Sequence, residues 1–149
     1  MQKLENNYVK IYTDGACLGN PGPGGWAAIL IFNGVHKELF GSENFTTNNK
    51  MELTAIVKAL AFLKKPCKVV VYSDSSYIVN CFKDKWYKRW LTNGWQKADG
   101  KRVENKDLWE QLLNLVSLHD VSFVKVKGHS NNFFNNRCDF LAKKAIKKF

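Results

Sequence analysis

The chain has 149 residues, 45% of them hydrophobic, which predicts a single globular domain over residues 1–149 and excludes a disordered protein. Lys and Arg number 23 against 13 Asp and Glu, a net charge of +10, so we expect a polyanionic partner, with nucleic acid favoured over a membrane surface. The sequence has no long apolar run, lipidation motif or signal-peptide core, which favours the cytoplasm. The four cysteines lack paired C-x-x-C spacing, and we interpret them as free thiols.

The first elements expected along the chain are three strands. Residues 8–14 alternate in the manner of a strand, residues 26–32 form a longer apolar strand, and residues 35–43 return after an Asn-Gly pair that favours a two-residue hairpin. Between the first two strands, residues 15–25 are too rich in Gly and Pro for a helix and predict a rigid turn.

The rest of the chain alternates helices with strands. Thr46 or Thr47 is a candidate N-cap for a helix that runs to about Lys64 and is stopped by Pro66. The remaining elements expected are a buried strand over 68–74, a helix over 75–82, a helical pattern within 103–119, a strand over 121–126 and a helix over 135–149. This order predicts an α/β fold with a five-stranded mixed sheet, three antiparallel strands joined to two parallel ones, flanked by helices on both faces.

Two acidic residues follow apolar strands. Asp14 and Asp74 both end a strand pattern, and the carboxyl ends of parallel strands are where sites gather in such sheets. Each has a local alternative, because Asp14 could begin a turn and Asp74 could cap the next helix.

Two further acids lie beside apolar helix faces. Glu52 extends the face of the first helix that should pack on the sheet, and Asp139 borders an apolar stripe of the last helix. Glu52 could instead pair with a nearby basic residue, and Asp139 could pair with Arg137 or Lys143.

Taken together, the four acids indicate a cation site. Converging carboxylates repel one another unless they are protonated or bridged by cations, and an unpaired buried charge costs several kcal/mol. Mg²⁺ prefers a few carboxylates together with water and phosphate oxygens. Two such ions can activate a water and stabilise the leaving oxygen in phosphodiester hydrolysis. The basic surface would attract nucleic acid, and the acids would hold the ions that cut it.

The order of the motifs resembles one family over nearly the whole chain. TDGACLGNPGPGGWAAIL, TTNNKMELTA, YSDSSYI, DLWEQL and VKVKGHSNNFFNNRCDFLA occur in this order and together resemble type 1 ribonuclease H of the bacterial type. The resemblance implies the ribonuclease H-like fold and hydrolysis of the RNA strand of RNA–DNA hybrids, leaving 5′-phosphate and 3′-hydroxyl ends. It also implies one or two Mg²⁺ ions, with Mn²⁺ as a possible substitute, and a monomer.

The resemblance assigns roles to the acids and to one histidine. It implies that Asp14 and Asp74 ligate both metals, whereas Glu52 and Asp139 support one each. His129 lies in a polar loop ten residues before Asp139, and an unperturbed His can transfer protons near neutral pH. Its alternative interpretation is a solvated loop residue. Many relatives place acids in this loop, where this chain has asparagines and phenylalanines.

Substrate-binding residues also follow from the resemblance. Those expected to face the minor groove of the hybrid are Gly15, Cys17, Asn20, Asn48 and Asn49. Thr47 would join a phosphate pocket for the DNA strand. Ser76 stands where many relatives carry a longer Gln, so its contact is lost or made through water.

Residues 82–102, here called the basic protrusion, hold seven Lys and Arg, two Asp and three Trp. They resemble the protrusion of many bacterial members, in which Lys85, Lys88 and Arg89 would grip DNA phosphates. The alternative is a solvated helix with Trp packed beneath it.

Two other functions remain open from the sequence. A relative on this fold could cut another nucleic acid, and a metal-free hybrid-binding module could have lost catalysis. The NN-x-MEL segment and the basic protrusion argue against the former, and the presence of all four acids argues against the latter.

Overall fold

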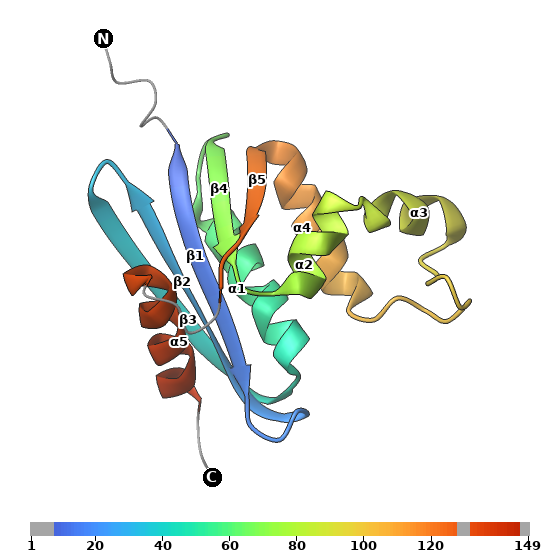
Figure 1. The fold of residues 1–149 in the computed structure, drawn as a ribbon, viewed down its shortest axis with the longest axis horizontal. Coiled ribbons are helices and arrows are strands. Elements are labelled where there is room, and N and C mark those ends of the chain that lie inside the picture. The colour runs from blue at the N-terminus through green and yellow to red at the C-terminus, as the bar shows by residue number, and fades with distance from the viewer. Residues whose placement is uncertain (1–7, 128–131, 147–149) are drawn as a thin grey trace.

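A computed structural model describes residues 8–127 and 132–146 of the chain, and it contains the expected five-stranded mixed sheet. The strands are β1 (Val9–Cys17), β2 (Gly22–Phe32), β3 (Val35–Thr46), β4 (Lys68–Ser73) and β5 (Asp120–Lys125). The helices are α1 (Asn48–Phe62), α2 (Ser76–Lys83), α3 (Trp86–Asn93), α4 (Lys106–Leu118) and α5 (Phe133–Ala145) (Figure 1).

The sheet order is β3-β2-β1-β4-β5, which places the first strand at the centre. β1 is antiparallel to β2 and β2 is antiparallel to β3, whereas β4 runs parallel to β1 and β5 runs parallel to β4. Because β1 and β4 are parallel neighbours, their carboxyl ends lie side by side at one edge of the sheet.

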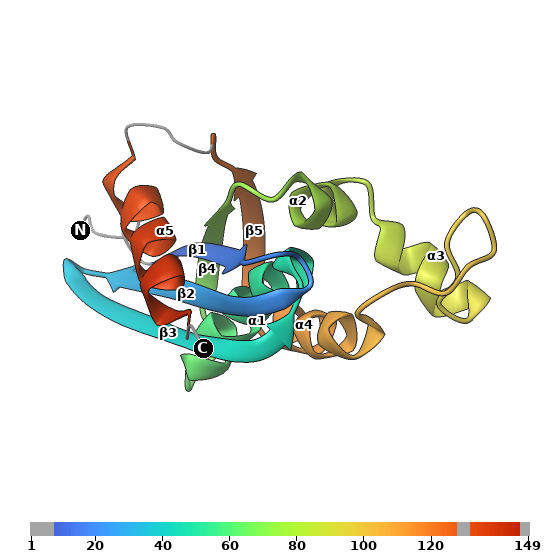
Figure 2. The same cartoon turned by 90° about the horizontal axis from the view of Figure 1, so that it is seen from below.

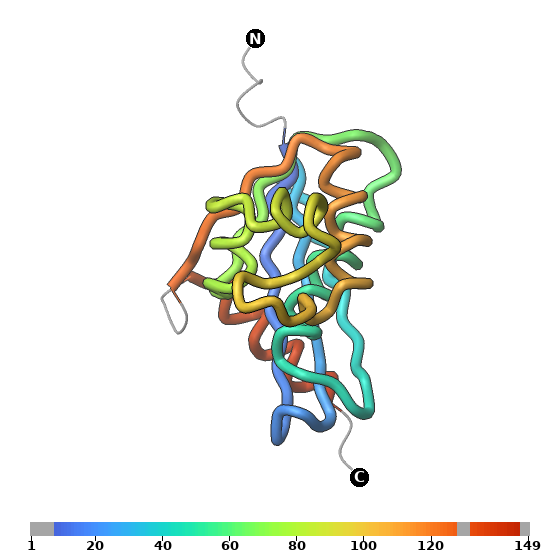
Figure 3. Tube along the Cα trace, turned by 90° about the vertical axis from the view of Figure 1, so that its right-hand side faces the viewer, coloured from blue at the N-terminus to red at the C-terminus, as the bar shows by residue number. Residues whose placement is uncertain are grey.

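Helices cover both faces of the sheet. α1 and α4 pack on one face, whereas α5 lies on the opposite face across β1, β2 and β3 (Figure 2). α3 stands away from the sheet at one end of the molecule, and Figure 3 looks at the molecule from that side. Within the described residues, no helix is both long and apolar enough to cross a bilayer.

The main core lies between the sheet and α1. Its largest fully buried side chains come from the inward face of β1 and β4 and from α1 and α4, among them Ile11, Val71, Ile56 and Trp109. A smaller cluster on the other face joins β1 and β2 to α5. All four cysteines are free thiols, as the sequence predicted.

Side-chain caps set where three helices begin. Thr47 accepts a hydrogen bond from the backbone N–H of Lys50, which confirms one of the two expected caps of α1. Ser75 caps α2 by accepting from Ile78, so the cap is not supplied by Asp74. Asn132 caps α5, which therefore begins two residues before the expected start at 135.

Several element boundaries differ from the sequence prediction. β1 continues to Cys17, and β2 begins at Gly22, which pairs with Thr46 of β3, while Gly24 and Gly25 pair with both neighbouring strands. The expected turn over 15–25 therefore shrinks to the residues between β1 and β2. β3 likewise continues to Thr46 instead of ending at 43, and α1 ends at Phe62. The helical pattern within 103–119 becomes a helix only at Lys106, after a buried Val103.

Candidate active site

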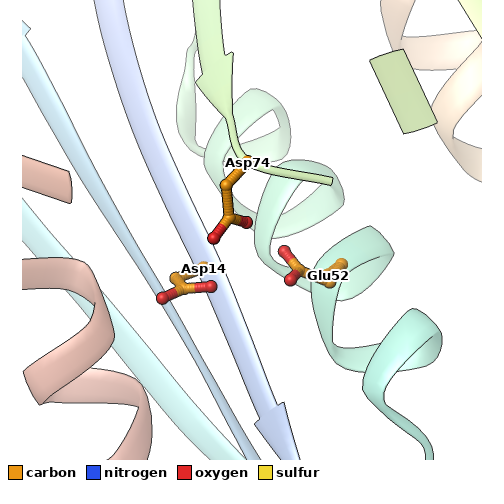
Figure 4. Close-up of side chains that lie close together, drawn as sticks. All are labelled: Asp14, Glu52 and Asp74. Atoms are coloured by element: carbon orange, nitrogen blue, oxygen red, sulfur yellow. The ribbon is translucent and has the colours of Figure 1, made fainter. Parts of the chain in front are cut away.

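Three of the predicted acids converge at the carboxyl end of β1 and β4. Asp14 lies on β1, Asp74 directly follows β4, and Glu52 lies in the second turn of α1. One carboxylate oxygen from each lies within 4.8 Å of the others, and Figure 4 shows the three side chains turned toward a common point. Asp14 and Glu52 are buried, and Asp74 is partly buried.

Glycine next to Asp14 allows this convergence. A Cβ atom on Gly15 would lie 2.6 Å from the backbone N of Glu52 and 2.7 Å from the backbone C of Met51. Only a glycine therefore lets the start of α1 pass this close to β1. The close approach brings the Glu52 side chain over the strand that carries Asp14.

The fourth acid reaches the same pocket from the opposite face of the sheet. Asp139 of α5 lines a pocket of about 320 Å³ together with Asp14, Glu52 and Asp74, here called the acidic pocket. Its Oδ2 atom also forms an ion pair with the Lys143 ammonium, 3.2 Å away and one helical turn along α5. The sequence left a pair with Lys143 open as an alternative to a site role; the structure contains this ion pair, and the site role of Asp139 stays a prediction.

Burial and mutual repulsion raise the pKa of two of these acids, Asp14 and Glu52. Burial, followed by the nearby Asp74, raises the pKa of Asp14 from 3.8 to about 8, although the N–H of Gly15 opposes the shift. Burial, followed by the charges of Asp14, Asp74 and Asp139, raises the pKa of Glu52 well above its usual range. The Oε1 atom of Glu52 is buried without a hydrogen-bond partner in the described part of the chain.

This donor set fits a hard divalent cation. Carboxylate oxygens are the ligands that such ions prefer, and a cation would offset the repulsion among the clustered carboxylates. The unpartnered Oε1 of Glu52 offers a buried oxygen at the same place. The geometry of the acidic pocket therefore suits divalent-metal chemistry.

Comparison with known proteins identifies the family of this chain. The family model described as RNase H matches residues 6–147. The chain belongs to the ribonuclease H family. Curated ribonucleases H from Caldanaerobacter subterraneus subsp. tengcongensis and Chlorobium chlorochromatii are 56% and 59% identical to it, covering 98% and 94% of this chain and 95% and 96% of theirs.

A solved structure of the ribonuclease H family shares the fold as well. LC11-RNase H1 in complex with an RNA/DNA hybrid is 26% identical, covers 93% of this chain and 96% of its own, and superposes with a TM-score of 0.72. The resemblance to type 1 ribonuclease H that the sequence motifs indicated is thereby confirmed.

The minor-groove residues that the family resemblance implied lie around the acidic pocket. Gly15, Cys17 and Asn48 line it. Asn20 Oδ1 accepts from the backbone N–H of Asn48 at 2.8 Å and so ties the turn after β1 to the start of α1. The Cys17 thiol is 3.3 Å from the carbonyl oxygen of Thr46, so the end of β1 also contacts the end of β3.

The other substrate-binding candidates are spread over nearby surfaces. Asn49 is exposed in the first turn of α1, and Thr47 caps that helix. Ser76 is exposed at the first position of α2. His129 lies outside the described residues.

The basic protrusion has the exposed cations and the packed tryptophans of a solvated helix, and its contact with DNA phosphates stays a prediction. Lys85, Lys88 and Arg89 are exposed on its surface, while Trp90 is buried. Trp86 and Trp90 share one face of α3, with ring centroids 6.4 Å apart. Cations therefore cover the outside of a helix whose aromatic face packs inward.

Sequence reasoning missed several residues of the acidic pocket. Asn135, Asn136 and Lys143 of α5 line it, as does Ala16 of β1. Helical spacing offered a signal for two of these, because residues four before and four after Asp139 lie one turn away on the same side. Asn135 is buried, and its Oδ1 has no hydrogen-bond partner in the described part of the chain.

Proposed function

We propose that this protein is an endoribonuclease that hydrolyses the RNA strand of RNA–DNA hybrids with divalent metal ions, leaving 5′-phosphate and 3′-hydroxyl ends. The observation that carries the proposal is the acidic pocket, in which carboxylates remote in sequence meet at one end of the sheet. Support comes from relatives named ribonuclease H and from a family member solved with an RNA/DNA hybrid.

Asp14, Glu52, Asp74 and Asp139 would hold the metal, which we propose to be one or two Mg²⁺ ions with Mn²⁺ as a substitute. When bound, such ions activate a water and stabilise the leaving oxygen of the scissile phosphate. Asp14 and Asp74 come from adjacent parallel strands, so they would provide the central ligands. Glu52 and Asp139 approach from α1 and α5 on opposite faces of the sheet.

The chain's own residues then govern protonation in the pocket. The pKa of Asp14 is raised to about 8 and that of Glu52 well above its usual range, so cation binding competes with protons for these two carboxylates. Lys143 neutralises part of the charge of Asp139. We propose that His129 transfers a proton or orients water during product release, with a smaller effect on the rate than the acids.

Hybrid recognition would use the backbone and the small polar groups beside the pocket. The A-like minor groove presents 2′-hydroxyl groups in a shallow surface, which amides and short side chains can reach. Gly15, Cys17, Asn20, Asn48 and Asn49 are proposed for this contact. They lie within or next to the acidic pocket, so a bound minor groove would present the RNA backbone to the carboxylates.

Phosphates of the DNA strand would be bound farther away. A hollow of about 730 Å³ lies between the starts of α1 and α4 and is lined by Lys50, Arg102 and Lys106. Thr47, which caps α1 three residues before Lys50, is proposed to join a phosphate pocket for the DNA strand. Lys85, Lys88 and Arg89 of the protrusion would extend the same phosphate track, and Ser76 would contact the hybrid directly or through water.

We also propose that residues 1–149 act as one domain, as a monomer, in the cytoplasm. Low net affinity for other copies follows from the charge of +10, because like-charged molecules repel one another. Size-exclusion chromatography with light scattering tests the monomer.

The test of this function uses end-labelled RNA–DNA hybrid, duplex DNA and duplex RNA with Mg²⁺ and purified protein. We expect cleavage of the RNA strand of the hybrid alone, abolished by EDTA and in an Asp14→Asn variant. Binding of hybrid without cleavage would identify an inactive binding module, and cleavage of duplex DNA would identify a nuclease of another substrate class. Either outcome would overturn the proposal.

A further inference from the structure

Asp139 differs from the other pocket acids in how the fold holds it. β1, α1 and the end of β4 all border the main core, which fixes Asp14, Glu52 and Asp74 relative to one another. α5 lies on the opposite face of the sheet (Figure 2). It packs there through a much smaller apolar cluster. The position of the Asp139 carboxylate therefore depends on how α5 is seated on the sheet.

The direction in which Asp139 points is set by the rotation of α5 about its own axis. Successive residues of an α-helix are turned by about 100° around its axis. Cys138 faces the sheet, because it is fully buried and its thiol is 3.3 Å from the carbonyl oxygen of Tyr12. Its neighbours Arg137 and Asp139 consequently lie on opposite flanks of α5. Asp139 points into the acidic pocket, and Arg137 points toward β3.

Arg137 is joined to β3 by a two-pronged ion pair. Its Nε and Nη2 atoms donate to the two carboxylate oxygens of Glu38 at 2.8 and 3.1 Å. Paired hydrogen bonds of this kind fix orientation as well as distance. These bonds also hold the pKa of the Glu38 carboxyl below its usual range, so Glu38 stays charged.

A second contact lies along the same two elements. His36, two residues before Glu38 on β3, packs edge-on against Phe134, with ring centroids 5.1 Å apart. Phe134 precedes Arg137 by three residues and so lies on a nearby part of the α5 surface. β3 therefore touches one flank of α5 at two successive points.

We propose that Glu38 and Arg137 form a positioning pair that fixes the rotation of α5 and thereby holds the Asp139 carboxylate in the acidic pocket. This inference rests on the proposed function, in which Asp139 is one of the metal-holding acids. The Lys143–Asp139 pair cannot play this part, because both residues belong to α5 and move with it. Glu38 and Arg137 are 99 positions apart and connect two elements.

The first test compares Glu38→Ala and Arg137→Gln with Glu43→Ala, which removes an exposed acid from the same strand. We expect each pair variant to lower kcat about tenfold, because small misplacements of a catalytic group are costly, while KM for the hybrid changes less than about twofold. Glu43→Ala should leave both parameters unchanged. Equal kcat for Glu38→Ala and wild type at a temperature where both are folded would overturn the proposal.

Two further variants separate positioning from general stabilisation. In an Asp139→Asn background, Glu38→Ala should have no further effect on kcat, since the pair acts through the Asp139 carboxylate. The double exchange Glu38→Arg with Arg137→Glu should restore most of the lost activity. A full tenfold loss in the Asp139→Asn background would mean that the pair does not act through Asp139.

Mg²⁺ binding measured without the hybrid tests the positioning pair independently of the proposed function. Calorimetric titration of Mg²⁺ into the protein alone should show severalfold weaker binding for Glu38→Ala than for wild type or Glu43→Ala. Unchanged Mg²⁺ affinity would contradict the positioning pair even if the hybrid is cleaved. Conversely, a wild-type protein that binds Mg²⁺ but cleaves no hybrid would refute the proposed function while leaving the pair supported by its weakened Mg²⁺ binding.

Discussion

The acidic pocket draws its carboxylates from β1, α1, the end of β4 and α5, whereas the basic protrusion is one continuous stretch of chain, residues 82–102. The pocket acids are buried or partly buried against the sheet. The cations of the protrusion are exposed on a helix that stands away from the sheet (Figure 1). The positions of the carboxylates, which must lie close together, thus depend on the whole fold. The positions of the cations, which need only to face the phosphates of a nucleic acid, depend on one local segment.

Aromatic packing connects the protrusion to the rest of the molecule. Trp90 packs against Trp109 of α4, with ring centroids 5.3 Å apart, and against Trp95 at 5.6 Å. Trp109 in turn donates its indole N–H to the Tyr77 hydroxyl at 2.9 Å. The aromatic side chains of the protrusion therefore belong to the main core, whereas its cations lie exposed on the other side of the helix, where they can be replaced without changing that packing.

The largest effect should come from the pocket. Asp14→Asn should lower kcat about a thousandfold, equivalent to ~4 kcal/mol of transition-state stabilisation, because it removes a central carboxylate from the cluster. Asp120→Asn, at an exposed acid of β5, is the matched control and should retain wild-type activity. Steady-state cleavage of labelled hybrid measures both, and a loss below tenfold for Asp14→Asn would contradict the role assigned to this residue.

The protrusion should affect binding instead of chemistry. Replacing Lys85, Lys88 and Arg89 together by Ala should reduce the slope of log affinity against log salt by about 2 to 3, since each lost phosphate contact removes roughly 0.7–0.9. The value of kcat at saturating hybrid should change less than about twofold. Binding isotherms over a series of salt concentrations give the slope.

The control for this variant removes the same charge from another surface. In this control, three exposed lysines on and just after α1 are replaced together by Ala: Lys58, Lys64 and Lys65. If this control lowers the slope as much as the protrusion variant does, net charge explains the effect and the protrusion makes no specific phosphate contacts.

The pocket should also leave a signature in stability. The pKa of Asp14 is raised to about 8, so between about pH 4 and pH 8 the folded metal-free protein holds protons that the unfolded chain has released. Its free energy of unfolding must therefore fall as pH rises through this window. Asp14→Asn should remove part of this loss. The free energy of unfolding of the variant minus that of wild type should therefore increase by on the order of 2 kcal/mol between pH 5 and pH 8. Urea unfolding in EDTA measures this, and a difference independent of pH would contradict the burial of this charge.

The smallest effect is expected beside the pocket. Ser76 is exposed at the start of α2, where the family resemblance places a longer Gln. Ser76→Gln should lower KM for the hybrid about twofold without changing kcat, because one weak polar contact is worth about 0.5 kcal/mol or more. Ser117→Gln on α4 serves as control, and an equal change of KM in both variants would remove Ser76 from the substrate surface.

Local pattern was enough to predict much of the pocket. Alternation placed Asp74 at the end of its strand, and helical spacing placed Glu52 on the packed face of α1. Asp14 was also expected to end a strand, but β1 continues to Cys17, so Asp14 lies within it. Once β1 and β4 are parallel neighbours, their ends must meet. The pattern could not decide between a site role and a local role for the same residue. Asp74, for example, could have capped α2, but in the structure Ser75 caps this helix.

Features that depend on contacts between distant elements were not predictable in this way. The ion pair between Glu38 and Arg137 requires knowing which flank of α5 faces β3, and no spacing in the chain encodes that. The early start of β2 at Gly22 has a similar cause. Glycines disfavour a strand on their own, but here the two neighbouring strands supply the hydrogen bonds that hold them extended.

The most direct test of the account is to locate Mn²⁺ by its anomalous scattering in crystals of the wild-type protein without hybrid. The account predicts a peak about 2.1 Å from carboxylate oxygens of Asp14 and Asp74, with Glu52 or Asp139 completing the protein ligands. An acidic pocket that stays empty at millimolar Mn²⁺, or a peak bound only by other residues, would contradict the claim that these carboxylates gather to hold a divalent ion.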